Sequence, residues 1–400
     1  MDMYDVAVVG AGPVGGYLAR RLNEHGHSVL LIEEHSEIGR PFQCAGLVNP
    51  KAMEMVDLET SVLTSIWGAN IHSPLGNPVS IGNPSRIRTF SVCRKIFDEG
   101  VVAQAIRTGT DLALSSKVVA AEVYDGYVEI DIETNEGLRN AKCKLLCGAD
   151  GAHSWVRRHF KMGRPKEMMI GFQIEVTGYD GDEGMLDMYT GSSIAPGFFS
   201  WAIPSGSTTR IGTWTVAKRM DGRSSEDYLN YLLSNRLLNS RFHNCTEIGR
   251  YCGPVPSGIV SKIALPRVVL LGDAAGVCKP TTGGGIGPGF EQVELVVPMI
   301  SGYITSNALG GRQMKRVNSI MNDMRRKQRR KKALRDAFLT EMSDDELEGI
   351  FSVWARPDVT ELINEVGEIE NPIPLGIAML KEVPEFRRLA SRAAKAILWG

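Results

Sequence analysis

The chain has 400 residues, 43% of them hydrophobic, and a formal net charge of −1 at pH 7. This length suffices for two or three domains, and the near-neutral charge gives no global attraction to nucleic acid. No apolar run reaches about 18 residues and the N-terminus enters a strand at once, which predicts neither a membrane-spanning helix nor a secretory signal. Seven scattered cysteines indicate free thiols in a reducing cytoplasm. Because no C-x-x-C pair occurs, we expect neither a zinc ribbon nor a cysteine-bound iron–sulfur cluster, and no metal-site residues are predicted.

The first predicted element is a buried parallel strand that runs into a glycine-rich turn. Tyr4–Val9 is short, apolar and rich in β-branched residues, as such strands are. Gly10, Gly12 and Gly15 follow at G-x-G-x-x-G spacing and open a predicted helix. The three glycines permit a tight turn, close approach of the backbone to a pyrophosphate, and close packing of the helix on the strand. The pattern therefore predicts a dinucleotide phosphate at the helix N-terminus.

An acidic residue ends the second predicted strand, Ser28–Ile32. Glu33 lies 23 residues after Gly10, where a carboxylate accepts hydrogen bonds from the ribose hydroxyls. Since a carboxylate repels a 2′-phosphate, Glu33 favours the adenosine of FAD or NAD over that of NADP.

Two kinds of predicted element follow along the chain, buried strands with a helix and the strands of an antiparallel sheet. Buried strands are predicted at Leu112–Ser116, Val118–Val123, Val128–Ile132, Lys144–Asp150 and Arg267–Leu271, with a helix at Arg94–Ile106. Alternating apolar and polar residues with Gly and Pro turns predict an antiparallel sheet at Gly171–Thr177, Met185–Tyr189, Phe198–Ile203 and Arg210–Val216. The chain beyond Gly311 is charged and predicted to be helical, with proline breaks.

Three separated motifs occur in a recognisable order. They are the fingerprint that ends in Glu33, the segment Gly148–Gly151 (GADG), and Leu271–Ala275 (LGDAA). In this order they resemble the glutathione-reductase-type flavoproteins of the p-hydroxybenzoate hydroxylase branch, over roughly Met1–Gly311. The resemblance implies FAD rather than NAD, because that branch holds the second half of the dinucleotide with the downstream Gly-Asp motif.

Two further segments are similar to the geranylgeranyl reductase family, whose archaeal members saturate isoprenoid chains of ether lipids. Pro196–Pro204 (PGFFSWAIP) is similar to the lipid-cavity motif P-x-x-Y-x-W-x-F-P, with Phe199 in place of Tyr and Ile203 in place of Phe. Pro280–Ile286 (PTTGGGI) matches the glycine-rich loop beside the isoalloxazine. The helix after this loop departs from the small residues usual there, at Pro288, Glu291 and Glu294.

The predicted fold class is α/β. It comprises a Rossmann-like FAD-binding domain, an inserted antiparallel β-sheet substrate domain and a helical C-terminal region. The FAD-binding domain is expected to be discontinuous, formed by residues 1–75, 94–165 and 255–311. Residues 76–93 and 166–254 form the predicted substrate domain, and 312–400 the helical region.

The fingerprint and the resemblance together give a set of FAD-binding candidates. They are Gly10, Gly12, Gly15, Glu33, Arg40, Cys44, Ala45, Leu47, Arg94, Val118, Asp273, Gly283, Gly284, Gly285 and Ile286. By resemblance, Asp273 binds the ribityl hydroxyls, and the amides of Gly285 and Ile286 lie near the pyrimidine end of the flavin, where negative charge develops on reduction.

Several of these candidates have a simpler structural interpretation. Cys44 is placed close to the flavin by the resemblance and is the candidate catalytic residue, although a single cysteine is by default a small apolar filler. A helix N-cap is the alternative for Asp273, and a solvated loop arginine for Arg40. Phe199 and Trp201 are candidate walls of a lipid cavity, or else core aromatics.

The resemblance implies an FAD-dependent reductase that saturates C=C bonds of geranylgeranyl chains in archaeal membrane lipids. Hydride from N5 of the reduced flavin would reach one alkene carbon, and Cys44 or a bound water would supply the proton. The electrons would come from NAD(P)H, ferredoxin or another external reductant. Two alternatives stay open: a flavin monooxygenase of the same branch, and an electron carrier like the quinone oxidoreductases of electron-transfer flavoproteins.

One strong charge cluster occurs, Arg325–Lys332 (RRKQRRKK). Such a run is usually a solvated helix face. The functional alternative is a patch that meets anionic lipid headgroups at the inner face of the membrane, each basic residue contributing on the order of 1 kcal/mol. Nucleic acid is not expected as a partner, because no matching motif or interleaved aromatic residue accompanies the run.

Overall fold

The computed structural model describes residues 3–41, 44–367 and 373–389. The first of its sheets has eight strands and is largely parallel. The order β18-β11-β1-β2-β8 is parallel throughout, while β9, β10 and β17 add antiparallel pairings. The strands of this sheet are β1 (Met3–Val9), β2 (Val29–Ile32), β8 (Asp111–Ala113), β9 (Ser116–Val123), β10 (Val128–Thr134), β11 (Gly137–Gly148), β17 (Ala264–Leu265) and β18 (Val268–Leu270).

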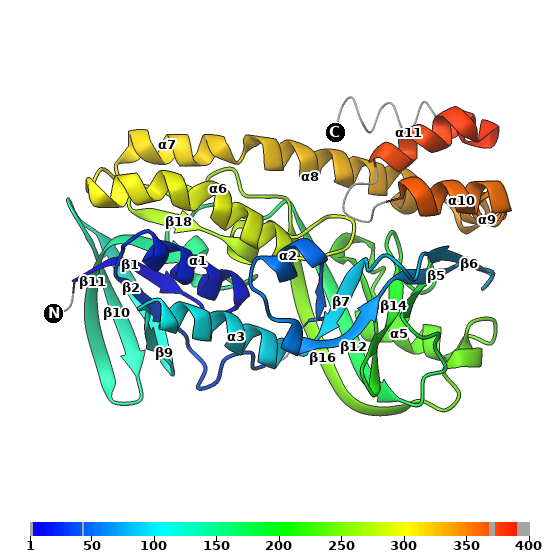
Figure 1. The fold of residues 1–400 in the computed structure, drawn as a ribbon, viewed down its shortest axis with the longest axis horizontal. Helices are drawn as coiled ribbons and strands as arrows, with labels where there is room; N and C mark the ends of the chain where they lie inside the picture. Colours follow the sequence, from blue (N-terminus) through cyan, green and yellow to red (C-terminus); the bar gives the residue numbers. More distant parts are fainter. Residues whose placement is uncertain (1–2, 42–43, 368–372, 390–400) are drawn as a thin grey trace.

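Helix α1 (Pro13–Glu24) occupies the centre of the helical layer on this sheet. It packs between α3 (Arg94–Arg107) and α6 (Ile286–Thr305), as Figure 1 shows. The strands beneath are almost wholly apolar, which is expected where both faces of a parallel sheet are covered. Two short helices, α2 (Pro50–Glu54) and α4 (Trp155–His159), follow the connecting loops.

A second sheet of seven strands lies at the other end of the molecule (Figure 1). Only the β13–β5 pair is parallel, and one face of the sheet packs on α5 (Ser225–Ser234). In sheet order the strands are β16 (Thr246–Ser257), β12 (Glu167–Thr177), β15 (Thr208–Val216), β14 (Ser200–Ser205), β13 (Met185–Tyr189), β5 (Gly68–His72) and β6 (Pro78–Gly82). A third sheet has three strands, in the order β3 (Leu47–Val48), β7 (Thr89–Val92) and β4 (Val62–Ile66); β5 and β6 of the second sheet fall between β4 and β7 along the chain.

The structure differs from the sequence-based expectation at two strands of the second sheet. β5 precedes residue 75, up to which the sequence was assigned to the FAD-binding domain, yet it pairs with β13. This pairing joins segments more than 100 residues apart, which no local pattern reveals. β16 was not predicted at all. Its Pro254 and Pro256 would disrupt a central strand, but β16 is an edge strand, where a missing N–H is tolerated.

The C-terminal part is helical, as predicted. Helices α7 (Gly311–Ile320) and α8 (Asn322–Arg335) run along one edge of the molecule, and α8 passes into a π-helical turn, η5 (Asp336–Thr340). α9 (Asp344–Trp354), α10 (Pro357–Val366) and α11 (Ile373–Glu382) form an apolar cluster of their own beside β6. Among the described helices, none is long and apolar enough to cross a bilayer. Short 3-10 segments are η1 (Glu59–Ser61), η2 (Ala217–Arg219), η3 (Asn239–Arg241), η4 (Gly272–Ala275) and η6 (Pro384–Leu389).

Candidate functional site

The glycine fingerprint forms the predicted turn between β1 and α1. Gly10 has a φ of +98°, and its N–H donates to the Ile32 carbonyl at 2.8 Å. A Cβ on Gly15 would collide with the Gly10 carbonyl, so helix and turn pack as closely as the fingerprint requires. Gly12 is the N-cap of α1, makes no side-chain cap bond, and has open space where its Cβ would lie. The first amides of α1 therefore face a space that an anion can enter.

Glu33 follows β2 directly and lies against this turn. Its Oε2 accepts a hydrogen bond from the Ala11 N–H at 2.9 Å, and its Oε1 accepts one from the His35 N–H at 3.0 Å. His35 Nδ1 also lies 2.6 Å from Oε1, so these contacts hold the carboxylate beside the fingerprint, and Oε2 has a lone pair left for a ligand. This is the position, at the end of the second strand, where the fingerprint predicts a ribose-binding acid.

A second helix N-terminus faces the same region from the downstream motifs. Gly285 is the N-cap of α6 without a side-chain bond, and Ile286 is its first helical residue. A Cβ on Gly285 would meet the carboxylate of Asp273, which is in η4 directly after β18. Burial raises the pKa of Asp273, and the Cys278 thiol donates to its Oδ1 at 3.1 Å. The structure thus brings Asp273, Gly285 and Ile286 together, as the resemblance implied.

Asp150 lies against Gly10 of the glycine fingerprint. Asp150 is half-buried, and its Oδ2 accepts the Val156 N–H at 3.0 Å, which supports the start of α4. Its Oδ1 is buried and has no partner among the described residues. Such an orphaned carboxylate oxygen beside Gly10 suits a ligand hydroxyl or water.

Arg94 begins α3 and is fixed by a bidentate pair with Asp98. Its Nε and Nη2 donate to the two carboxylate oxygens at 2.9 and 2.8 Å. Burial alone would lower the pKa of Arg94, but Asp98 and the adjacent Cys44 raise it, so the guanidinium stays charged. Arg94 therefore places a permanent positive charge next to the Cys44 sulfur.

The Cys44 loop is tied to the seven-stranded sheet through side chains. Trp201 Nε1 donates to Gln173 Oε1 at 3.2 Å, and Gln173 Nε2 donates to the Cys44 carbonyl at 3.5 Å. Arg210, on β15, donates to the Ala45 carbonyl at 3.0 Å. A candidate substrate residue and the candidate catalytic residue are thus joined through a single glutamine.

An aromatic cluster, defined here as Phe198, Phe199, Trp201 and Trp214, lies on the face of the sheet opposite α5. Trp214 makes edge-to-face contacts with the other three, at centroid distances of 4.9 to 6.1 Å. A Cβ on Gly283 would overlap the Trp214 ring, so the glycine-rich loop packs directly on the cluster. Trp214 Nε1 is buried without a partner among the described residues. Predicted residues that meet in or against this cluster are Ala45, Leu47, Phe199 and Trp201.

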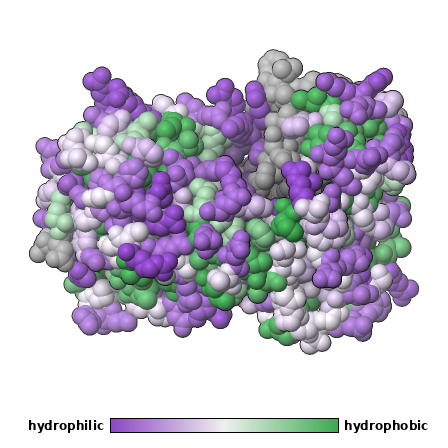
Figure 2. All heavy atoms as spheres, in the orientation of Figure 1, coloured by the Kyte–Doolittle hydropathy of each residue, from purple (hydrophilic) through white to green (hydrophobic). Residues whose placement is uncertain are grey.

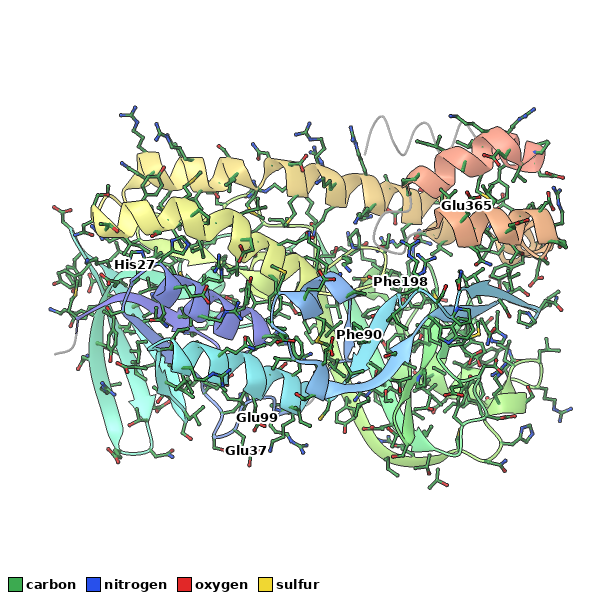
Figure 3. All side chains as sticks on the ribbon, in the orientation of Figure 1. His27, Glu37, Phe90, Glu99, Phe198 and Glu365 are labelled. Carbon is green, nitrogen blue, oxygen red and sulfur yellow. The ribbon has the colours of Figure 1, made fainter. Side chains whose placement is uncertain are left out.

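No pattern in the sequence distinguishes Trp214, or Arg335 at the end of α8, as a site residue. The guanidinium of Arg335 is buried, forms a bidentate pair with Glu167 at 2.8 and 2.9 Å, and donates to the Pro280 carbonyl at 2.9 Å. It also lies 5.5 Å from the ring centroid of Phe198, which Figure 3 labels between the sheet and the C-terminal helices. Arg335 therefore connects the C-terminal region to both the glycine-rich loop and the aromatic cluster.

The unusual residues of α6 have structural roles away from the site. Glu294 accepts hydrogen bonds from Tyr17 OH at 2.7 Å and Arg21 Nε at 2.8 Å, both on α1. Glu291 pairs with Lys51 at 3.0 Å. Pro288 is the third residue of α6, where its missing N–H leaves no helical bond unmade. The departures from the family pattern thus serve helix contacts and leave the glycine-rich loop unchanged.

The structure leaves the roles of two predicted cofactor residues, Arg40 and Val118, untested. Arg40 is exposed in the loop after β2, next to residues 42–43, which lie outside the described chain. Val118 is buried in β9, where the register with β10 shifts. Their roles remain predictions.

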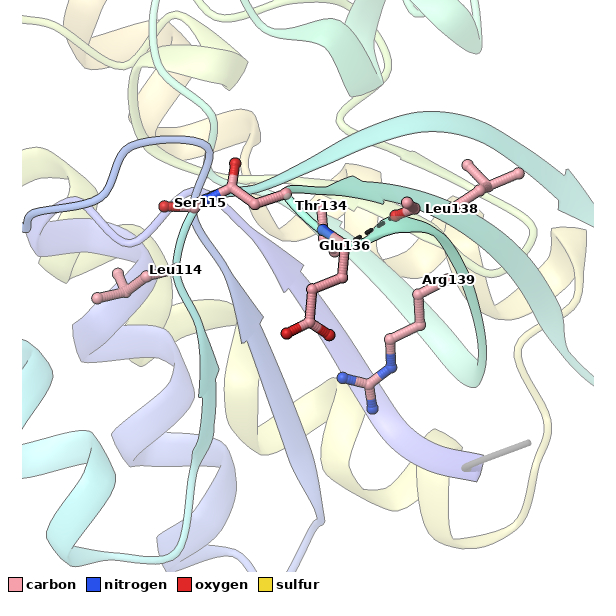
Figure 4. Close-up of a pocket in the computed structure, with 8 residues that line it drawn as sticks. Leu114, Ser115, Thr134, Glu136, Leu138 and Arg139 are labelled. Atoms are coloured by element: carbon pink, nitrogen blue, oxygen red, sulfur yellow. Dashed lines mark hydrogen bonds between the residues drawn. The ribbon is translucent and has the colours of Figure 1, made fainter.

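A separate open pocket between the turns after β8 and β10 (Figure 4) is lined by Leu114, Ser115 and residues 134–139, and contains none of the predicted site residues.

Comparison with known proteins places this arrangement in a family. The family model described as lycopene cyclase protein matches residues 5–358. Digeranylgeranylglycerophospholipid reductase of Methanosarcina acetivorans is 31% identical over 295 residues, 71% of this chain and 72% of that protein. Digeranylgeranylglycerophospholipid reductase 3 of Methanosphaera stadtmanae is 29% identical over 376 residues, 90% of this chain and 92% of that protein.

Solved structures show the same fold. A geranylgeranyl bacteriochlorophyll reductase-like protein from Thermoplasma acidophilum superposes with a TM-score of 0.86 at 24% identity, covering 98% of this chain and all of the other. A p-nitrophenol 4-monooxygenase of Pseudomonas putida gives a TM-score of 0.72 at 16% identity, covering 91% of this chain and 97% of the other. At these identities the likeness establishes the fold alone. The sequence matches go further: the chain belongs to the family of the digeranylgeranylglycerophospholipid reductases, and it fits the lycopene cyclase family model over most of its length.

Proposed function

We propose that this chain binds FAD between the N-termini of α1 and α6 and uses it to saturate C=C bonds of geranylgeranyl chains in archaeal membrane lipids. Support comes from the family membership and from the two open helix ends with Glu33 and Asp273 beside them. One observation carries the choice of an apolar substrate: the aromatic cluster packs on Gly283 and is joined through Gln173 to the Cys44 loop. An apolar wall thus lies directly against the proposed flavin seat.

The chemistry divides between cofactor and protein. Reduced FAD, when bound, supplies a hydride from N5 to an isolated alkene. The protein must orient the chain and exclude water, because such an alkene has no carbonyl that a side chain could polarise. Cys44 is the proposed proton donor. Its sulfur accepts the Gly46 N–H at 3.4 Å and lies beside Arg94. Because both neighbours are donors, the thiol hydrogen is not used in these contacts and can be donated to a substrate.

The direct test is reduction of an unsaturated archaeal lipid. Protein loaded with FAD and reduced chemically under anaerobic conditions should add two hydrogens for each double bond, measured as a mass gain of the product. Absence of any gain would refute the reductase. NAD(P)H-driven oxygen consumption with an aromatic substrate would favour the monooxygenase, and a stable one-electron flavin state without lipid turnover would favour the electron carrier.

Replacing Glu33 with alanine is expected to weaken FAD binding by at least about a hundredfold. The side chain is proposed to accept hydrogen bonds from two ribose hydroxyls, and a bond to a charged group contributes roughly 1.5–3 kcal/mol. Flavin fluorescence quenching gives the dissociation constant. His35→Ala is the matched control, because it removes a partner of Glu33 and keeps the carboxylate; it should change affinity no more than a few fold. Unchanged affinity in E33A would contradict the role.

A further inference from the structure

Charge is distributed very unevenly along this nearly neutral chain. Residues 311–335, which form α7 and α8, contain eleven Lys and Arg and a single acid, Asp323, and so carry +10. Because the whole chain carries −1, the remaining 375 residues carry −11. Like charges repel and lower stability when they are gathered in this way. Solubility alone therefore does not explain why the positive charge is concentrated in α7 and α8.

Only some of these basic residues lie on the inner face of α8, where they bind other parts of the protein. Arg325 donates to the Val260 carbonyl at 3.1 Å, Gln328 donates to the Val277 carbonyl at 2.7 Å, and Arg335 is buried as described above. The outer face is different. The exposed basic residues of the two helices, named here the basic ridge, are Arg312, Lys315, Arg316, Arg326, Lys327, Arg329 and Arg330.

The shape of the basic ridge fits a flat partner. A helical segment of 25 residues extends about 37 Å at 1.5 Å per residue. α7 and α8 follow one another along the upper edge in Figure 1, and hydrophilic side chains project from that edge in Figure 2. Nitrogen-tipped side chains point outward from both helices in Figure 3. A long, projecting line of flexible cations can contact a plane along its full length, whereas a compact protein partner would cover only part of it.

We propose that the basic ridge docks on an anionic lipid bilayer. Charge complementarity and shape favour a bilayer over nucleic acid or an acidic protein. The proposal also rests on the proposed function, in which the substrate is a membrane lipid. The end of α8 contacts the candidate site, because Arg335, its last residue, donates a hydrogen bond to the Pro280 carbonyl of the glycine-rich loop. Docking would thus hold the loop and the aromatic cluster close to the membrane that carries the substrate.

The test is binding of the full chain to vesicles, which requires no turnover. Sedimentation with phosphatidylcholine vesicles containing about one third phosphatidylglycerol should show binding that is lost in pure phosphatidylcholine and weakened by salt. The triple variant R326Q/R329Q/R330Q should bind roughly a hundredfold more weakly, since each basic residue near an anionic surface contributes about a fivefold increase in partition. Its thermal unfolding should match wild type because the three side chains are exposed.

The control is a triple variant with the same charge change elsewhere, R107Q/K117Q/R236Q, whose residues are also exposed. It should bind anionic vesicles within a few fold of wild type. Equal losses in both triple variants, or no preference for anionic over neutral vesicles, would overturn the proposal. Tighter binding to duplex DNA than to anionic vesicles at the same salt would also overturn it. Failure of lipid reduction with intact vesicle binding would refute the proposed function and leave the docking surface standing.

Discussion

Replacing Arg335 with methionine is expected to lower the free energy of unfolding by about 3–5 kcal/mol. The substitution leaves Glu167 and Asp336, both largely buried, without their guanidinium partner, and it removes the donor to the Pro280 carbonyl. Lys332 still pairs with both carboxylates, which places the effect nearer the lower end of that range. Denaturant unfolding followed by circular dichroism measures the loss.

Arg356→Met is the comparison for this prediction. Arg356 pairs with Asp358 and Glu385, both at 2.7 Å, but the pairs are exposed and should contribute less than about 1 kcal/mol. Arg335→Lys should recover only part of the stability, because an ammonium cannot form the bidentate pair. Equal losses in R335M and R356M would show that Arg335 has no special role.

The Arg335 cluster also makes stability depend on pH. Burial alone would raise the pKa of Asp336, but Lys332 and Arg335 lower it below the ordinary aspartate value. Because the folded-state pKa is depressed, this stabilisation is present above the ordinary pKa and is lost as the pH falls through the folded value. The difference in stability between wild type and R335M should therefore be largest near neutral pH and shrink below about pH 4.

Cys44→Ala is expected to lower kcat for lipid reduction by a factor of roughly a hundred to ten thousand, the range typical of a removed general acid. FAD affinity should change little, because Arg94, Asp98 and the loop carbonyls keep their partners. Single-turnover mass spectrometry of the lipid, starting from chemically reduced protein, isolates this step from delivery of electrons.

Two variants distinguish a proton donor from a packing residue. Cys44→Ser conserves size and an O–H donor and should retain part of the activity, with a shifted pH profile. Cys252→Ala, which alters an exposed thiol, should leave kcat unchanged. Full activity in C44A would assign the proton to another donor, such as a bound water.

Local patterns in the sequence predicted the dinucleotide-binding part well. The strand, turn, helix and acid from Tyr4 to Glu33 form as expected, because each step depends on neighbouring residues only. The downstream Gly-Asp motif and the glycine-rich loop were placed through family resemblance, and the structure brings them together at the N-terminus of α6.

Residues that act through long-range contacts escaped prediction. Trp214 lies on β15, which is buried on both faces, so no alternation of polar and apolar residues shows which side faces the site. Arg335 follows a run of exposed cations and is distinguished from them only by burial against Glu167, 168 residues away. Glu294, whose charge looked out of place beside a flavin loop, has its partners on α1.

The contact between α1 and α6 has a consequence for how a ligand is acquired. Tyr17 stacks on Phe290 with centroids 4.3 Å apart, and Glu294 on α6 forms an ion pair with Arg21 on α1. The helix ends proposed to hold opposite halves of the dinucleotide are therefore fixed relative to each other by the protein itself. A preorganised seat of this kind loses little conformational entropy when it is filled. The proposed seat would thus be formed before flavin binds, and its affinity would depend on how well the helix ends match the ligand.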